Sequence, residues 1–163
     1  MTGKLKKSWQ EKLEDSKGLP KVEKITKKMS GRWGTKEGNT VVIPAPTEVD
    51  EIMKKVPKGK IITINRIREV LARKHNATIG CPITTGIFAR IAAGAAGDAE
   101  RAGEKDITPY WRTLKSGGDL NEKYPGGVQR QARRLQEEGL EIEPGKGKKP
   151  PKVKDFERYL VEL

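Results

Sequence analysis

The chain contains one cysteine and one histidine, the side chain types that most often supply a nucleophile and its base. Cys81 is followed by Pro82, and proline favours the first position of a helix. A helix beginning there would lower the pKa of the thiol and activate it as a nucleophile. The other interpretation, which we favour, makes Cys81 a small, partly buried apolar side chain. His75 lies in a Lys-His-Asn turn and is expected to be exposed.

These single residues exclude several classes of site. One cysteine cannot build a disulfide framework or a cysteine-based zinc site, and one histidine cannot build a histidine-rich metal centre. We therefore expect neither a metal nor a cofactor.

The charge of the chain points to a polyanionic partner. It has 163 residues, with 34 Lys+Arg against 22 Asp+Glu, for a net charge of +12. The excess is spread along the sequence, because residues 1–45 contribute +6 and residues 46–139 contribute +5. A spread positive excess is typical of a nucleic-acid-binding surface, and a solvated, lysine-rich surface is the alternative.

The sequence also predicts where the protein works. The first 30 residues are lysine-rich without an apolar segment, and no stretch approaches 18 apolar residues. We expect a cytoplasmic protein, nucleoid-associated if the organism is prokaryotic, that does not contact a membrane.

Three stripes of apolar residues at helical spacing predict three helices in the middle of the chain. These helices would position any functional site there. Thr47 and Thr63 each precede one as an N-cap candidate, and Pro82 begins a third helix over about 82–97. The apolar positions are Val49, Ile52 and Met53 in the first, Ile64, Ile67 and Leu71 in the second, and Ile83, Ile87, Ile91 and Ala95 in the third. The second and third helices, joined by a short turn, indicate a helix-turn-helix.

The two ends of the chain complete the predicted fold. Ser8 and Glu11 form a capping box, Val22, Ile25 and Met29 suggest a second short helix, and 40–43 suggests a strand. Residues 140–142 and Val153 predict a hairpin, and 156–163 a final helical stripe. We predict a mainly α fold: a winged-helix-like helix-turn-helix domain with a short hairpin over 47–163. A helical N-terminal extension over 1–46 would pack with few residues.

Three motifs carry a family resemblance. The segment from Val56 to Thr63 contains a proline-x-glycine turn before the helix-turn-helix, and Pro-Tyr-Trp-Arg follows at 109–112. Downstream come a glycine-rich loop and its closing helix, with Ser116, Gly117, Leu120, Tyr124, Gly126, Gly127, Leu135, Glu138 and Gly139. In this order and spacing, residues 47–140 resemble the DNA-binding C-terminal domain of the O6-alkylguanine-DNA alkyltransferases, and more closely their non-catalytic alkyltransferase-like branch.

The departures from this family concern its chemistry. The family transfers an alkyl group to a cysteine thiolate, with a histidine base oriented by a glutamate. Here Tyr110 stands at the cysteine position and Trp111 at the histidine position, while Glu138 matches the glutamate. The resemblance therefore implies no alkyl transfer and no catalytic residue. The vestigial active-site positions are Pro109, Tyr110, Trp111, Arg112, Tyr124 and Glu138.

The two aromatic residues allow two interpretations. Tyr110 and Trp111 could form a wall that stacks on a flipped or damaged base. They could instead fill the vestigial pocket and complete the core, and we favour this second interpretation.

The third helix corresponds to the recognition helix of the family, which lies in the minor groove and inserts an arginine finger. Gly86 stands at the finger position in the register that Pro82 favours, and Arg90 stands there in a slipped register. The helix is rich in small residues such as Ala89 and Ala93, which suit either a narrow groove or close packing against another helix. Ile64 replaces a family tyrosine that crowds a phosphate.

The resemblance and the charge together imply a non-catalytic protein that binds double-stranded DNA, including alkylated or distorted DNA, as a monomer linked to repair proteins. A DNA-binding module that does not recognise damage is the alternative, and an active transferase is the less favoured third hypothesis. The candidate DNA contacts are Lys58, Lys60, Thr63, Arg66, Arg68, Gly86, Ala89, Arg90, Ala93, Arg112 and Arg130.

Overall fold

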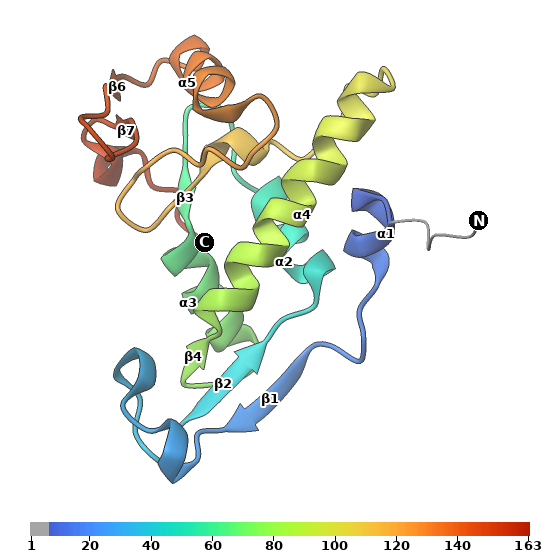
Figure 1. Cartoon of the computed structure of the whole chain (residues 1–163), viewed down its shortest axis with the longest axis vertical. Coiled ribbons are helices and arrows are strands. Elements are labelled where there is room, and N and C mark those ends of the chain that lie inside the picture. Colours follow the sequence, from blue (N-terminus) through green and yellow to red (C-terminus); the bar gives the residue numbers. More distant parts are fainter. Residues whose placement is uncertain (1–6) are drawn as a thin grey trace.

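A computed structural model describes residues 7–163, and this part of the chain contains five α-helices and three small sheets (Figure 1). The helices are α1 (Trp9–Glu14), α2 (Pro46–Lys54), α3 (Ile64–Lys74), α4 (Pro82–Arg101) and α5 (Gly127–Glu137). The mainly α fold class is confirmed.

The sheets tie distant parts of the chain together. Strand β2 (Thr40–Ile43) runs antiparallel to β1 (Lys21–Lys24) and parallel to β4 (Ile79–Gly80). Strands β3 (Ile62–Thr63) and β5 (Thr113–Leu114) form a parallel pair. The predicted hairpin is confirmed, because β6 (Ile142–Glu143) pairs antiparallel with β7 (Lys152–Val153).

Local capping explains where the helices begin. Ser8 and Glu11 form the predicted capping box of α1, and the Thr63 hydroxyl accepts from the Arg66 amide at 3.2 Å. The prediction that Thr47 caps its helix is wrong. The N-cap is Ala45, two residues earlier, because Pro46 favours the first helical position and the Glu48 carboxylate accepts from the Ala45 amide at 3.0 Å.

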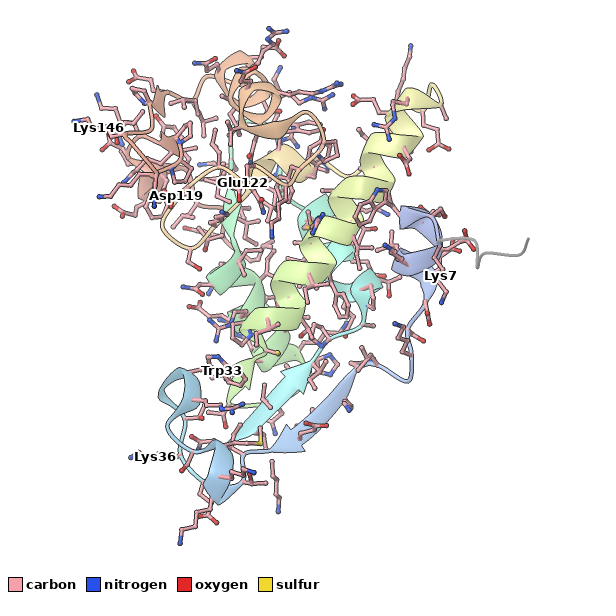
Figure 2. The ribbon with its side chains drawn as sticks, in the orientation of Figure 1. Lys7, Trp33, Lys36, Asp119, Glu122 and Lys146 are labelled. Atoms are coloured by element: carbon pink, nitrogen blue, oxygen red, sulfur yellow. The ribbon has the colours of Figure 1, made fainter. Side chains whose placement is uncertain are left out.

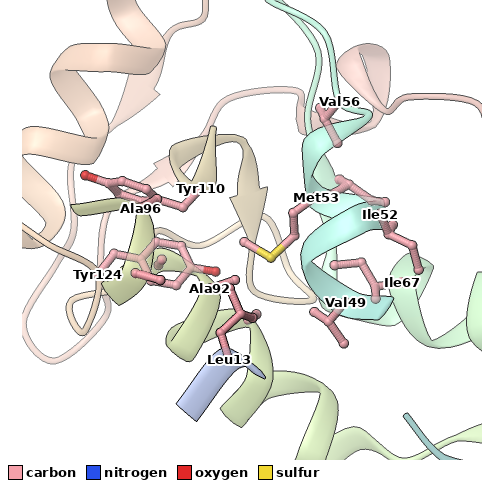
Figure 3. Close-up of a cluster of buried hydrophobic side chains, with 14 of the residues drawn as sticks. Leu13, Val49, Ile52, Met53, Val56, Ile67, Ala92, Ala96, Tyr110 and Tyr124 are labelled. Carbon is pink, nitrogen blue, oxygen red and sulfur yellow. The ribbon is translucent and has the colours of Figure 1, made fainter. Parts of the chain in front are cut away.

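The small face of α4 is the centre of the largest core. Ala89 and Ala93 are 1% and 0% exposed, and Ala92 and Ala96 lie beside Leu13 and Met53 (Figure 3). A side chain at Gly94 would overlap the ring of Trp9 in α1. The alternative that placed this face in a DNA groove is therefore wrong, and Ala89 and Ala93 are not DNA contacts. Small residues stand there because α1 and α2 approach the backbone of α4 closely.

Replacing Ala93 with leucine should therefore lower stability. The added atoms enter a fully buried position, and overpacking of this kind costs about 1–3 kcal/mol. Thermal unfolding of Ala93→Leu should show a lower Tm, whereas DNA affinity measured well below that Tm should change little. An unchanged Tm would contradict the packing described here.

The N-terminal segment packs more extensively than predicted. Val22 lies in β1, and Ile25 and Met29 follow in a turn with two short 3₁₀ helices, η1 (Lys27–Met29) and η2 (Arg32–Gly34), so the predicted second helix is wrong. Pairing with β2 satisfies the backbone of this segment and overrides its helical spacing. Helix α1 packs on α4. The domain boundary after residue 46 stays a prediction.

The prediction of a final helical stripe over 156–163 is also wrong. A 3₁₀ turn, η4 (Phe156–Tyr159), is followed by extended chain that pairs with the start of β3. The Ile61 amide donates to the Tyr159 carbonyl at 2.9 Å, and the Val161 amide donates to the Ile61 carbonyl at 2.8 Å. These backbone bonds compete with a helix and fix the C-terminal chain against the core.

Candidate nucleic-acid interface

An apolar stripe runs along the exposed side of α4. Ile83 and Ile87 are 61% and 50% exposed, Gly86 lies between them, and the exposed Arg90 continues the stripe by about one turn. From the sequence, Ile83 and Ile87 share one apolar stripe with Ile91 and Ala95, of which Ala95 is buried and Ile91 half-buried. Because the opposite, small face is buried, the stripe is held outward, where two neighbouring isoleucines are available for contact with another molecule.

A groove of about 340 Å³ separates this stripe from the loop that follows β5. Helix α3 contributes Ile64 to its floor, and a Cβ at Gly86 would meet only open space. Figure 2 labels Asp119 and Glu122 on the loop. The remaining lining residues are Ile83, Ile87, Arg90, Lys115, Asn121, Glu122 and Lys123.

The groove carries a positive excess. Three of its lining residues are cations, Arg90, Lys115 and Lys123, against the single carboxylate of Glu122. Lys115 pairs with Glu122 at 3.0 Å, while Arg90 and Lys123 have no carboxylate partner among residues 7–163. The Arg90 guanidinium lies 5.7 Å from the centre of the Trp9 ring. An apolar stripe between unpaired cations suits a duplex, whose phosphates flank an apolar interior.

Buried hydrogen bonds from α5 hold the loop in place. The Gln131 side chain, 1% exposed, accepts from the Asn121 amide at 2.8 Å and donates to the Trp111 carbonyl at 3.2 Å. The Asn121 side chain in turn accepts from the Lys123 amide at 2.9 Å. The groove is therefore formed before any ligand binds.

The structure brings together few of the predicted contacts. Gly86 and Arg90 line the groove, whereas Thr63 is 6% exposed and serves as an N-cap. Arg66 donates to Glu69 at 2.7 Å, and Arg68 donates to the Gly80 carbonyl at 2.8 Å. Three of the predicted contacts, Lys58, Lys60 and Arg130, are exposed outside the groove. Lys58 and Arg130 line a cleft of about 770 Å³ beside α5, where Arg130 pairs with Glu100 at 2.9 Å.

Tyr110 fills the cysteine position of the vestigial active site, whereas Trp111 and Glu138 line the cleft of about 770 Å³ beside α5. Tyr110 is 1% exposed and meets the Trp111 ring edge-on, with ring centres 5.4 Å apart. It also meets Tyr124 edge-on, with ring centres 5.7 Å apart (Figure 3). Burial raises the pKa of Tyr110 above its ordinary value, and raises the pKa of Tyr124 as well. The Tyr110 ring completes the core together with the buried Pro109, so the interpretation of Tyr110 as a base-stacking wall is wrong.

Glu138 organises a partly buried network that includes Trp111, the residue at the family's histidine position. Its carboxylate accepts from Arg112 at 2.7 Å, from the Trp111 indole at 3.0 Å and from the Gly59 amide at 3.2 Å. Burial acts to raise the pKa of Glu138, but these hydrogen bonds outweigh it and hold the pKa below its ordinary value. Arg112 also donates to the Val56 carbonyl at 2.8 Å.

Arg112 is therefore a structural residue. Its side chain is 14% exposed and faces Glu138, so the prediction that it binds a DNA phosphate is wrong. Arg134 lies over the Trp111 ring at 4.2 Å from its centre and pairs with Glu100.

Cys81 and His75, the candidate nucleophile and base, both have structural roles. Cys81 is 7% exposed and packs with Ile25 and Val41, which confirms the apolar interpretation. The prediction of an exposed His75 is wrong, because its Nε2 lies 2.7 Å from the Glu48 carboxylate and its side chain is 19% exposed.

Residues 7–163 contain neither a candidate metal site nor a helix that could span a membrane. Within that range, the acidic, histidine and cysteine side chains nowhere gather in threes around a position that could hold a metal ion. Every helix in the same range is too short or too polar to cross a membrane.

The chain is similar to known proteins in structure but not in sequence family. No model of a known protein family matches the sequence, and no curated protein matches it. Among solved structures, S. pombe Atl1 in complex with damaged DNA containing O6-carboxymethylguanine is similar, with 23% identity and a TM-score of 0.49. A structure of S. pombe ATL in complex with DNA is similar with 22% identity and a TM-score of 0.45. Each alignment covers 72% of this chain and 94% of the other.

Proposed function

We propose that this chain is a non-catalytic, alkyltransferase-like protein that binds double-stranded DNA through the exposed stripe of α4. The observation that carries the proposal is the pair of exposed isoleucines, Ile83 and Ile87, beside the unpaired cation Arg90. Apolar side chains that enter a minor groove pack against base edges or wedge between base steps, while flanking cations neutralise phosphates. Arg90, Lys115 and Lys123 are the cations nearest to the stripe.

Recognition of alkylated or distorted DNA, linked to repair, is the finer part of this proposal. Two features support it: the resemblance over residues 47–140, and the open groove beside Gly86, where an extruded base finds space against Ile64. The buried Tyr110 closes the deeper position at which the family holds its thiol, so a recognised base would lie nearer the surface.

The proposal is tested by titrating the protein with matched duplexes that are plain, mismatched or carry one O6-alkylguanine. We expect binding to all three in low salt and tighter binding to the modified duplexes. Equal affinity for the plain, mismatched and alkylated duplexes would contradict damage recognition. It would favour a DNA-binding module that does not recognise damage. Gly86→Arg adds a long cation beside the groove and should increase the preference for the mismatch, because the guanidinium can fill the place of an extruded base. If none of the duplexes binds, the proposal fails as a whole.

We expect no alkyl transfer. Tyr110 is buried with a raised pKa, and Cys81 is buried under the N-terminal hairpin, so neither presents a reactive anion to a ligand. Intact-mass spectrometry after incubation with an alkylated duplex, or with O6-benzylguanine, should show the unmodified mass. An added alkyl mass on either residue would contradict this prediction.

A further inference from the structure

The turn between β1 and β2 is a second cationic surface, distinct from the groove. Residues 26–39 contain four basic side chains and one acidic side chain, Glu37, for a net charge of +3. All four cations are exposed, and none has a carboxylate partner among residues 7–163. They are Lys27, Lys28, Arg32 and Lys36.

This turn is firmly built. The Gly31 amide donates to the Thr35 carbonyl at 2.7 Å, and the buried Thr35 hydroxyl donates to the Arg32 carbonyl at 2.6 Å. At its base, the Ile25 amide donates to the Asn39 carbonyl at 2.7 Å, and Ile25 is 1% exposed. The cations are therefore presented on an ordered backbone.

A tryptophan stands at the tip of this turn. Trp33 is 38% exposed, and its backbone has φ 54° and ψ 27°, a left-handed conformation that disfavours side chains with a Cβ. A glycine would adopt this conformation without cost, and glycines flank it at 31 and 34. An exposed indole in a strained conformation stabilises the free protein little, which points to a contact with another molecule.

The turn lies at the end of the molecule where α4 begins. Met29 packs against the cluster of Ile25, Val41 and Cys81, and Cys81 is the residue that precedes α4. Figure 2 labels Trp33 and Lys36 on this turn. A duplex that followed the axis of α4 past Ile83 and Ile87 would extend towards the turn.

We propose that this turn is a second DNA contact, in which the four cations bind phosphates flanking the α4 site and Trp33 stacks on an unstacked base. The inference rests on the proposed function, because the α4 stripe sets where the duplex lies. Unpaired cations around one exposed aromatic ring are the combination that binds nucleic acid strands, through phosphate neutralisation and stacking.

Trp33→Gly tests this proposal, because stability and binding should move in opposite directions. Glycine relieves the left-handed backbone, so the Tm should stay the same or rise. Loss of a stacked base should weaken binding to a duplex of two helical turns, about 20 base pairs, by about 5- to 100-fold. On a duplex of one turn, about 10 base pairs, which is filled by the α4 contact, the loss should be small. Val22→Ala, which trims another exposed apolar side chain of the same hairpin, is the matched control and should leave binding unchanged.

A second variant tests the cations. Arg32→Gln combined with Lys36→Gln should reduce the slope of log K against log salt by about 1.8 on the long duplex, because two phosphate contacts are lost. If both variants bind the long duplex like the wild type, the turn is not a DNA contact, and the proposed function still stands if Ile87→Glu loses binding. If the wild type binds no duplex of either length, the proposed function fails and this inference fails with it.

Discussion

Ile87→Glu should weaken duplex binding by about 30- to 100-fold, because it removes an apolar contact of roughly 2 kcal/mol and brings a negative charge to the phosphates. The side chain is 50% exposed and lies on the stripe that we place against DNA. Its removal should leave the fold intact, since the buried face of α4 lies on the other side. Fluorescence anisotropy with a labelled duplex measures the loss, and an unchanged Tm confirms that the fold persists.

Two matched variants separate the causes of this loss. Ile87→Gln removes the apolar contact without adding charge, so it should show part of the effect. Gln136→Glu adds the same charge at an exposed position of α5, away from the stripe, and should change affinity by less than about twofold. If Ile87→Glu and Gln136→Glu weaken binding equally, the stripe is not the contact and only the overall charge matters.

Glu138→Gln should be the most destabilising of the substitutions considered for this chain. It leaves the Arg112 guanidinium, 14% exposed, without its anion, and a partly buried pair broken on one side costs about 3 kcal/mol. Chemical denaturation measures this loss as a lower unfolding midpoint. The double variant Glu138→Gln with Arg112→Met should recover much of the stability, because it leaves no unpaired charge. No recovery would show that the pair itself, and not the stranded cation, supplies the stability.

The same network predicts how stability depends on pH. The pKa of Glu138 is lower in the folded protein than its ordinary value of 4.5, so the folded state favours the charged form. The resulting stability is fully present above the unfolded pKa and is lost as pH falls through the folded pKa. As the pH is lowered past about 4.5, the unfolding midpoint of the wild type should therefore decrease. The midpoint of Glu138→Gln should decrease less steeply over the same range. The pKa values of Glu48 and Glu100 are also lowered, so these residues contribute to the dependence of stability on pH in both proteins.

Local signals in the sequence were sufficient for much of the fold. The capping box at Ser8, the N-cap at Thr63 and the proline at the start of α4 depend on residues within a few positions of each other. Strand β2 and the β6–β7 hairpin also follow from local alternation and turn residues. Each of these features forms from neighbours, so its pattern can be read without the tertiary structure.

The site depended on contacts that span the chain. Both sides of α4 are apolar at helical spacing, and the buried side is the one on which Trp9 lies against Gly94, where a Cβ would overlap its ring. The bond from Arg112 to Glu138 joins residues 26 positions apart, and the Gly59 amide reaches Glu138 across 79 positions. Neither pairing leaves a local pattern. Ile83 and Ile87 could have been found only by asking which α4 face is narrow enough for close packing.

Binding of the wild-type protein to a plain 20-base-pair duplex, measured over a range of salt concentrations, tests the central claim most directly. Arg90 and Lys123, the unpaired cations of the groove, should neutralise at least two phosphates, which predicts a slope of log K against log salt of about −1.8 or steeper. A linear plot with this slope, made shallower by about 0.9 in Lys123→Gln, is the expected result. A flat plot, or no binding at about 50 mM salt, would contradict the assignment of the α4 groove as a DNA-binding surface.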